Sequence, residues 1–400
     1  MSALDVSILD QGLARLDQGL ARALPDATGS RSPFLIEATG NCEAASQAWG
    51  ELEASGSAFQ SRRWLATWHE QIGRAVGAQP VFLIVRDRAA RRPAALFALC
   101  VRRRFGVKVV EFPDLGVTDY NAPLCARDLA LTDAELEALW AQARLAIPGA
   151  DVFVFEKLPE AIYGRPMPFA RLSWLKPMRL RCWTLALPAS RANYDRTALR
   201  ARDRKEQRRK RRNLVERLGE LRLVEAAGDE AAGVFAALKA MRAARFRRQG
   251  RRDLLQEPRF ARFYEALALR GEPGFVSLVS VSAGEREIAA LLGLRHADAY
   301  VLIMHSFAAD FEPLSPGVVA IDQLMTHLID SGVGYCDFTT GDESYKKQFG
   351  VRECGMRHGL DAVTPLGRLF AAAYRAAGWL RAAAAAALGE YARGLRRWRG

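Results

Sequence analysis

The chain has 400 residues, half of them hydrophobic, and its 58 Lys and Arg against 45 Asp and Glu give a formal net charge of +13. This composition predicts a folded globular protein of two or three domains and excludes a disordered chain. No apolar run reaches the roughly 18 residues of a membrane-spanning helix. Six isolated cysteines and five scattered histidines argue against a metal site and a disulfide framework.

The first part of the chain predicts an α/β lobe behind a polar N-terminal extension at 1–45. Asp5 and Asp10 stand where a signal peptide is basic, so we expect a cytoplasmic protein whose first 30 residues form a loose helix or a disordered lead-in. An aromatic face from Trp49 to Trp68 then predicts a helix. The N-terminal lobe at 46–180 is completed by buried strands at 79–87 and 150–159, two strands within 94–113, a loop at 115–124 and a helix at 131–146.

The second part predicts a C-terminal lobe at 181–363 with the same plan. A strand at 181–188 precedes a long basic helix from about 192 to 218, and a further strand and two helices occupy 221–271. Residues 275–310 read as three antiparallel strands with turns at Ala283–Gly284 and Ala297–Asp298. Both halves therefore place a helix, meandering strands, a helix and a strand in the same order, which favours a duplicated fold.

The segment 300–351 is the richest in chemistry. It predicts a strand, a loop with Ser315-Pro316-Gly317, a helix, a second strand and a polar turn. The unpaired amides and positive dipole end of a helix bind anions, Pro suits its first turn, and Gly lets a phosphate approach the backbone. An ordinary helix start has the same tripeptide, so the loop by itself leaves both interpretations open.

The stretch SPGVVAIDQLMTHLIDSGVGYCDFTTGDESYKKQFG, residues 315–350, resembles the CelD/BcsL family of GNAT-like acetyltransferases, which is related to the FemAB aminoacyltransferases. The basic stretches 205–220 and 241–250 resemble the same family, although the usual GNAT loop R/Q-x-x-G-x-G/A is replaced here by SPG. The resemblance implies an α/β (α+β) chain with a tandem GNAT-like acyl-CoA N-acyltransferase fold, in which helices flank mixed, mostly antiparallel sheets.

The resemblance also implies roles for individual residues. Acetyl-CoA, or another acyl-CoA, is the implied donor, with its pyrophosphate on the loop Ser315, Pro316, Gly317, Val318 and Val319. Tyr345 is the candidate acid for the leaving thiolate, the candidate bases are Asp337, Glu343 and His305, and the candidate substrate contacts are Lys346, Arg245 and Arg212. Other interpretations stay open, because Asp337 can cap a turn, Tyr345 and His305 can belong to the core, and the lysines can be solvated.

By the same resemblance we expect an acyltransferase that modifies a sugar, an amino sugar or a polysaccharide precursor in exopolysaccharide, cellulose or envelope synthesis. One alternative is a FemAB-like enzyme that uses aminoacyl-tRNA, since residues 196–217 hold eleven basic and three acidic residues, although no aromatic residue is interleaved for nucleic-acid stacking. Another is a non-catalytic scaffold whose basic helical tail at 364–400, with seven arginines and one glutamate in 366–400, binds an anionic membrane surface at the inner face.

Overall fold

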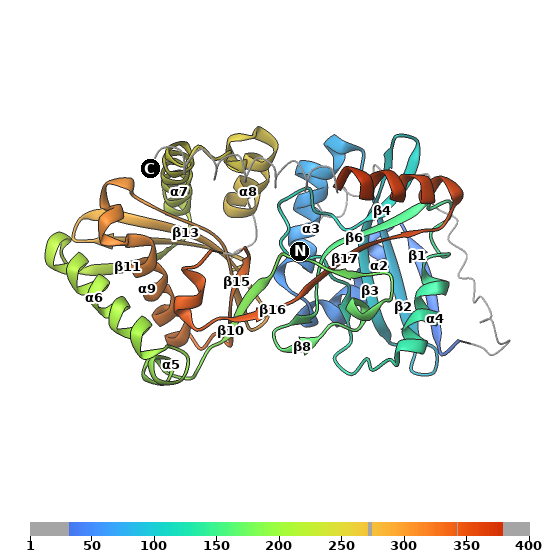
Figure 1. Ribbon diagram of the computed structural model, residues 1–400, viewed down its shortest axis with the longest axis horizontal. Coiled ribbons are helices and arrows are strands. Elements are labelled where there is room, and N and C mark those ends of the chain that lie inside the picture. Colours follow the sequence, from blue (N-terminus) through green and yellow to red (C-terminus); the bar gives the residue numbers. More distant parts are fainter. Residues whose placement is uncertain (1–31, 271–273, 342, 379–400) are drawn as a thin grey trace, which may run out of the picture.

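The computed structural model describes residues 32–270, 274–341 and 343–378, which form two lobes side by side (Figure 1). The lead-in at 1–30 and most of the basic tail, from residue 379 onward, lie outside the described residues, and what the sequence predicts for them stays a prediction. In the described part of the chain, no helix is both long and apolar enough to cross a membrane.

An eight-stranded mixed sheet forms the N-terminal lobe, with the order β1-β2-β3-β4-β6-β17-β9 and β5 paired to β3. Its helices are α2 (Cys42–Leu52), α3 (Arg62–Trp68) and α4 (Asp133–Ala143). The turn between β3 and β4 places Phe105 and Gly106 at positive φ, as the tight turns of twisted hairpins require. The strands are β1 (Phe34–Thr39), β2 (Gln79–Asp87), β3 (Pro93–Arg104), β4 (Val107–Glu111), β5 (Leu124–Cys125), β6 (Val152–Pro159), β9 (Lys176–Pro177) and β17 (Met356–Ala362).

A seven-stranded sheet forms the C-terminal lobe, with the order β11-β12-β13-β14-β15-β10-β16. Its strands are β10 (Cys182–Ala186), β11 (Leu221–Ala226), β12 (Val276–Ala283), β13 (Arg286–His296), β14 (Ala299–Phe307), β15 (Tyr335–Thr340) and β16 (Arg352–Cys354). Its helices are α5 (Arg191–Thr197), α6 (Ala201–Leu218), α7 (Asp229–Arg248), α8 (Pro258–Arg270) and α9 (Pro316–Asp330). A small hairpin of β7 (Ala161–Ile162) and β8 (Arg165–Pro166) stands apart from both sheets.

The chain crosses between the lobes twice, and strand pairing follows these crossings. β10 comes directly after the N-terminal lobe and joins β15 and β16 of the C-terminal sheet. β17 returns to the N-terminal sheet, where it pairs with β6, although the sequence places its residues in the lobe at 181–363. The strand β1 likewise lies inside the predicted extension at 1–45 and pairs with β2. A lobe of this protein is therefore not one continuous segment of chain.

Two layers of helices cover the C-terminal sheet, α6 and α9 on one face and α7 and α8 on the other (Figure 1). The face under α7 and α8 is continuous with the core of the N-terminal lobe, since Trp64 of α3 packs on Phe263 of α8 with ring centroids 4.9 Å apart. The two lobes thus share one hydrophobic cluster, which holds residues of α3 against those of α8.

Two of the predicted helices are divided in the structure. The helix predicted from Trp49 to Trp68 is split between the end of α2 and α3, with short 3-10 turns at Glu53–Ser55 and Ala58–Gln60 between them. The basic helix predicted at about 192–218 is broken into α5 and α6, because Arg200 is extended at ψ 146° and Leu199 turns into the core. The Ala- and Arg-rich tail begins as a helix over 365–378. Its Phe370 packs on Val107, Val109, Val152 and Val154 of the N-terminal sheet, so at least this part of the tail is attached to the protein body.

Candidate functional site

The two parallel strands of the C-terminal sheet separate at the centre of the protein. β14 and β15 pair only over Ala299–Val301 and Tyr335–Asp337. The register between β13 and β14 shifts just beyond, between Leu292 and Gly293, which leaves Ile303 as an extra residue in β14. A bulge of this kind bends a strand and redirects its backbone groups. The strands therefore diverge from Val301 and Asp337 onward, and side chains that follow them border the gap.

Asp337 lies at this point of divergence, on the face that meets the N-terminal lobe. It is 0% exposed, and its Oδ1 accepts hydrogen bonds from the Tyr120 hydroxyl at 2.6 Å and from the Thr339 amide at 2.7 Å. Its Oδ2 makes no hydrogen bond of good geometry among the described residues, although the hydroxyl of Tyr163 lies near enough to lower the pKa of the carboxyl. A buried carboxylate oxygen without a partner is costly, so this position is suited to a ligand.

Burial raises the pKa of Asp337 to about 7, even though the hydrogen bonds from Tyr120 and Thr339 act in the opposite direction and favour the charged form. Asp119 contributes a further rise by charge repulsion. A carboxyl whose pKa lies near neutrality is able to take a proton at physiological pH and to release it again. The pKa of Asp337 thus suits a general base.

The backbone around Asp337 is strained. Thr339, a buried β-branched residue, has a φ of 56°, in the left-handed region that such residues rarely adopt. Its neighbour Thr340 donates a 2.5 Å hydrogen bond to Asp119 of the N-terminal lobe. Strained residues persist where surrounding contacts determine the conformation, and they concentrate at functional sites. The end of β15 is therefore held in place by contacts from both lobes.

His305 and Tyr345 lie together on the other side of the divergence, towards α9. Their rings meet edge to face with centroids 5.1 Å apart. Burial, with Arg245 and Lys346 adding to it, lowers the pKa of His305 to about 3, so its imidazole is neutral at pH 7 and a weak base. Burial and the charge of Glu343 raise the pKa of Tyr345 above its ordinary value, so the phenol keeps its proton and remains a possible donor.

Lys346 and Glu343 hold the polar turn after β15 together. The Lys346 ammonium is only 3% exposed, donates to the Thr340 carbonyl at 2.7 Å and pairs with Glu343 at 3.0 Å. Burial acts to raise the pKa of Glu343, but Lys346 outweighs it and the pKa is lowered. Glu343 is thus a weaker base than Asp337 at neutral pH. Gly341 allows this turn, because its φ is 122° and a Cβ there would meet the Glu343 carboxylate at 2.3 Å.

The start of α9 lies against the end of β14. Ser315 is in the left-handed conformation, and its carbonyl accepts the amides of Val318 at 3.1 Å and Val319 at 3.3 Å. Pro316 has no amide hydrogen, so Gly317 supplies the first N–H of the helix. A Cβ on Gly317 would come within 2.9 Å of the Phe307 ring, which shows how closely the helix approaches the strand.

Arg245 reaches the same place from α7. Its guanidinium lies over the Phe307 ring, 5.2 Å from the ring centroid. Burial lowers the pKa of Arg245, its Nε has no hydrogen-bond partner, and no carboxylate within the described ranges forms an ion pair with it. A half-buried cation beside a helix N-terminus is arranged to receive an anion. Arg212 is not part of this group, since it lies exposed on α6 and faces Glu216 at 3.8 Å.

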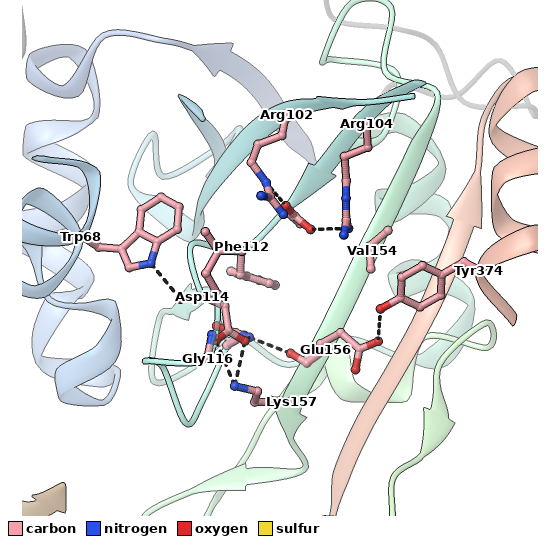
Figure 2. A pocket seen from close by; sticks show the side chains of 13 residues that line it. Trp68, Arg102, Arg104, Phe112, Asp114, Gly116, Val154, Glu156, Lys157 and Tyr374 are labelled. Atoms are coloured by element: carbon pink, nitrogen blue, oxygen red, sulfur yellow. Dashed lines mark hydrogen bonds and ion pairs between the residues drawn. The ribbon is translucent and has the colours of Figure 1, made fainter. Parts of the chain in front are cut away.

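A pocket of about 260 Å³ opens in the N-terminal lobe, again where two parallel strands diverge (Figure 2). Here β4 and β6 pair up to Glu111 and Val154, and the pocket begins directly beyond. Trp68, Phe112 and Tyr374 supply aromatic walls, while Glu156, whose pKa is raised by burial, and two arginines supply charge. The lining residues are Trp68, Arg102, Arg104, Glu111, Phe112, Asp114, Leu115, Gly116, Asn121, Val154, Glu156, Lys157 and Tyr374.

The loop 113–121 separates this pocket from Asp337. Asn121 faces the pocket and bonds Asp114, whereas the adjacent Tyr120 bonds Asp337. The sequence predicts a loop here but not its partner in the other lobe. The helix α4 that follows has its first turn closed by a capping box between Thr132 and Glu135, so the start of this helix is unlike that of α9.

In the described part of the chain, no three His, Cys, Asp or Glu side chains come together as a group that could hold a metal ion. The candidate site consists instead of a buried carboxyl, a phenol, an imidazole and a cation near a helix start. Asp337, His305, Tyr345, Lys346, Glu343 and Arg245 are brought close to the divergence of β14 and β15, as are the residues that open α9.

Comparison with known proteins bears on the domain and the fold that carry these residues. Residues 201–347 match the family model of the acetyltransferase (GNAT) domain. The crystal structure of FemX has a TM-score of 0.53 with this chain, at 11% identity, covering 78% of this chain and 95% of FemX. The C-terminal domain of a putative lysylphosphatidylglycerol synthetase from Agrobacterium fabrum has a TM-score of 0.48, at 10% identity, covering 83% of this chain and 96% of that one. No curated protein matches the sequence.

The similarity to FemX concerns the fold, and it covers both lobes. Together with the matched domain it confirms the tandem GNAT-like fold predicted from the sequence. The matched domain contains β14, α9 and β15, the elements that surround the divergence. The chain is therefore an acyltransferase enzyme with a GNAT-type acetyltransferase domain in its C-terminal lobe.

Proposed function

We propose that the enzyme transfers an acyl group, most simply acetyl, from acyl-CoA to an amine or hydroxyl of a sugar or polysaccharide precursor. The observation that carries the proposal is the buried Asp337 carboxyl, with a pKa of about 7 and an unpaired Oδ2, at the divergence of β14 and β15. The acceptor approaches from the side of the N-terminal lobe and the donor from the side of α9.

The donor's pyrophosphate is assigned to the start of α9. The Val318 and Val319 amides already donate to the Ser315 carbonyl, so the Gly317 amide and the Arg245 guanidinium are the donors best placed for a phosphate. Gly317 lies against Phe307, and Phe307 against Arg245, so these two groups belong to one small area. The pantetheine arm then follows the gap between the strands towards Asp337.

The chemistry requires one proton to leave the acceptor and one to reach the sulfur. The acceptor's lone pair attacks the thioester carbonyl while Asp337 takes the proton from its nitrogen or oxygen. The tetrahedral intermediate collapses, the C–S bond breaks, and the Tyr345 hydroxyl protonates the leaving thiolate. Tyr120 and Tyr163 cover the Asp337 carboxyl, so the acceptor has to displace the hairpin that carries Tyr163 in order to reach Oδ2.

The resemblance to the CelD/BcsL family is what favours a sugar acceptor. The N-terminal pocket is consistent with it, since sugars are bound by aromatic walls and carboxylates, and Trp68, Phe112 and Glu156 line this pocket, although its Arg102 is already paired with Glu111. The loop 113–121 connects this pocket to Asp337, so an extended acceptor bound there can present its reactive end to the base.

A FemAB-like transfer from aminoacyl-tRNA is the second candidate, favoured by the exposed arginines of α6. Several of these are already paired within the protein, as Arg209 is with Glu206 at 2.7 Å and Arg208 is with Asp195 at 3.3 Å. This pairing reduces the charge that the helix can offer to phosphates, and acyl-CoA remains the better supported donor.

Calorimetric titration of the full chain with CoA and with acetyl-CoA tests the donor. We expect binding that weakens at least tenfold in Arg245→Gln and stays unchanged in Arg247→Gln, an exposed neighbour on the same helix. Absence of binding at millimolar CoA contradicts the proposal. Affinity for RNA that falls steeply with salt, and is lost on charge reversal at Arg208–Arg212, would instead support the tRNA donor.

A further inference from the structure

Two cysteines face each other where the chain crosses between the lobes. Cys182 of β10 and Cys354 of β16 are direct partners in the antiparallel register, and the Cys182 Sγ lies 3.5 Å from the Cys354 carbonyl oxygen. Both are free thiols. Directly opposed residues in antiparallel strands have Cα atoms about 4.5–5.5 Å apart, which lies within the roughly 4.4–6.8 Å that a disulfide accepts. The strands therefore need little movement for the two sulfurs to join.

The environment of Cys354 favours reaction there over the other cysteines. Cys354 is half-buried rather than buried, and its contact with Cys182 lowers the pKa of the Cys354 thiol while raising that of Cys182. The thiolate is the form that oxidants attack. Burial instead raises the pKa of Cys100, Cys125 and Cys336, which keeps those thiols protonated and inaccessible.

We propose that Cys182 and Cys354 form a reversible disulfide under mild oxidation by a peroxide. Hydrogen peroxide oxidises the Cys354 sulfur to a sulfenic acid with release of one water. The Cys182 sulfur then attacks that sulfur, the S–S bond forms, and a second water leaves. Two thiols and one peroxide thus give one disulfide and two waters. This site goes beyond the acyltransferase reaction, and its formation does not depend on the proposed acceptor or donor.

The position of the pair links it to the catalytic carboxyl. Two residues along β10 from Cys182, Thr184 is the register partner of Asp337, and Cys182 also lies close to Tyr120. A disulfide would join the strand that enters the C-terminal lobe to the strand that leaves it. Because this cross-link closes the long stretch of chain between two neighbouring strands of the C-terminal sheet, we expect the oxidised protein to unfold at a higher temperature.

The test uses the full chain treated with one equivalent of hydrogen peroxide, alkylated and digested without reductant. We expect one cross-linked pair of peptides that contains residues 182 and 354. Its mass should be lower by two hydrogen atoms than the sum of the two unalkylated peptides. Dithiothreitol should reverse both this change and the rise in Tm. Cys354→Ser should lose the cross-link, whereas the matched control Cys42→Ser, on α2 and also half-buried, should keep it.

Either of two results with the unmodified protein would overturn the proposal. One is oxidation of Cys354 to sulfinic acid with no cross-link, and the other is a cross-link that joins a different pair. In Cys182→Ser, which lacks the attacking thiol, a sulfenic acid at Cys354 should persist and react with a dimedone probe. Absence of that adduct also contradicts the mechanism, and Cys354→Ser remains informative if Cys182→Ser fails to fold, since Cys354 is the less buried of the two.

Discussion

Replacing Asp337 by Asn removes the proposed base. The same change also removes a buried carboxyl whose ionisation makes the stability of the protein depend on pH. The pKa of this carboxyl is about 7 in the folded protein, mainly because of burial, against about 3.9 in an unfolded chain. At about 1.36 kcal/mol per pKa unit, keeping it ionised costs about 4 kcal/mol of folding stability. Because the pKa is raised on folding, the Asp337 carboxyl costs no folding stability below about pH 4, where it is protonated in both states. The cost of about 4 kcal/mol appears as the pH rises from about 4 to about 7. About 2.5 kcal/mol of that loss falls between pH 5 and pH 8.

Urea unfolding of Asp337→Asn and of the unmodified protein at pH 5 and pH 8 measures this loss of stability. The free energy of unfolding of Asp337→Asn minus that of the unmodified protein should increase by about 2.5 kcal/mol between the two pH values. Asp229→Asn, an exposed acid at the start of α7, is the control and should show no such increase. The pH profile of kcat/KM should rise through about 7 in the unmodified enzyme, and Asp337→Asn should lose about 10²- to 10⁴-fold in activity. A difference in stability that is the same at both pH values, together with an unchanged pH profile, would refute the assignment.

Three further substitutions separate the roles of the surrounding groups. Tyr345→Phe keeps the ring packed on His305 but removes the acid, so kcat should fall at least tenfold while the affinity for acyl-CoA is retained; equal kcat would exclude Tyr345 as the acid. Tyr120→Phe removes a donor that holds down the pKa of Asp337, and the rising limb of kcat/KM should move to higher pH, whereas a shift to lower pH would contradict this role of the hydrogen bond. Arg245→Gln should raise the KM for acyl-CoA at least tenfold with the Tm little changed, because Arg245 makes no ion pair in the described part of the chain; Arg247→Gln serves as its control.

The local pattern of hydrophobic and turn residues in the sequence was sufficient to predict the order of helices and strands around the site. The three antiparallel strands, the helix after Ser315 and the strand that carries Asp337 all follow from hydrophobic periodicity and turn residues, which act over a few positions. The same short range places Tyr345 and Lys346 just after the strand that carries Asp337. Lys346 shows the limit of such reasoning, because the sequence does not reveal that the Thr340 carbonyl and Glu343 bind its ammonium and hold it inside the turn. Its role as a substrate contact stays a prediction.

Long-range contacts were not predictable from pattern. The hydrogen bond between Tyr120 and Asp337 joins residues 217 positions apart, and nothing in the loop composition identifies its partner. The same holds for β17, since a seven-residue strand with a mixed pattern carries no signal for the sheet it joins. It pairs with β6 although most of the preceding chain belongs to the other lobe, and this choice is set by the packing of both sheets.

The boundaries between the lobes along the sequence therefore do not coincide with the boundaries of the candidate site, which draws on residues from both lobes. The matched domain at 201–347 contains Asp337, Tyr345 and Arg245, but it lacks β10, which pairs with β15, and Tyr120, which holds the Asp337 carboxyl. Without the N-terminal lobe this carboxyl would be exposed to water, its pKa would return towards the ordinary value, and it would be a weak base at neutral pH. Burial at the interface is what gives Asp337 its pKa of about 7, so in the proposed mechanism the N-terminal lobe contributes to the chemistry as well as to acceptor binding.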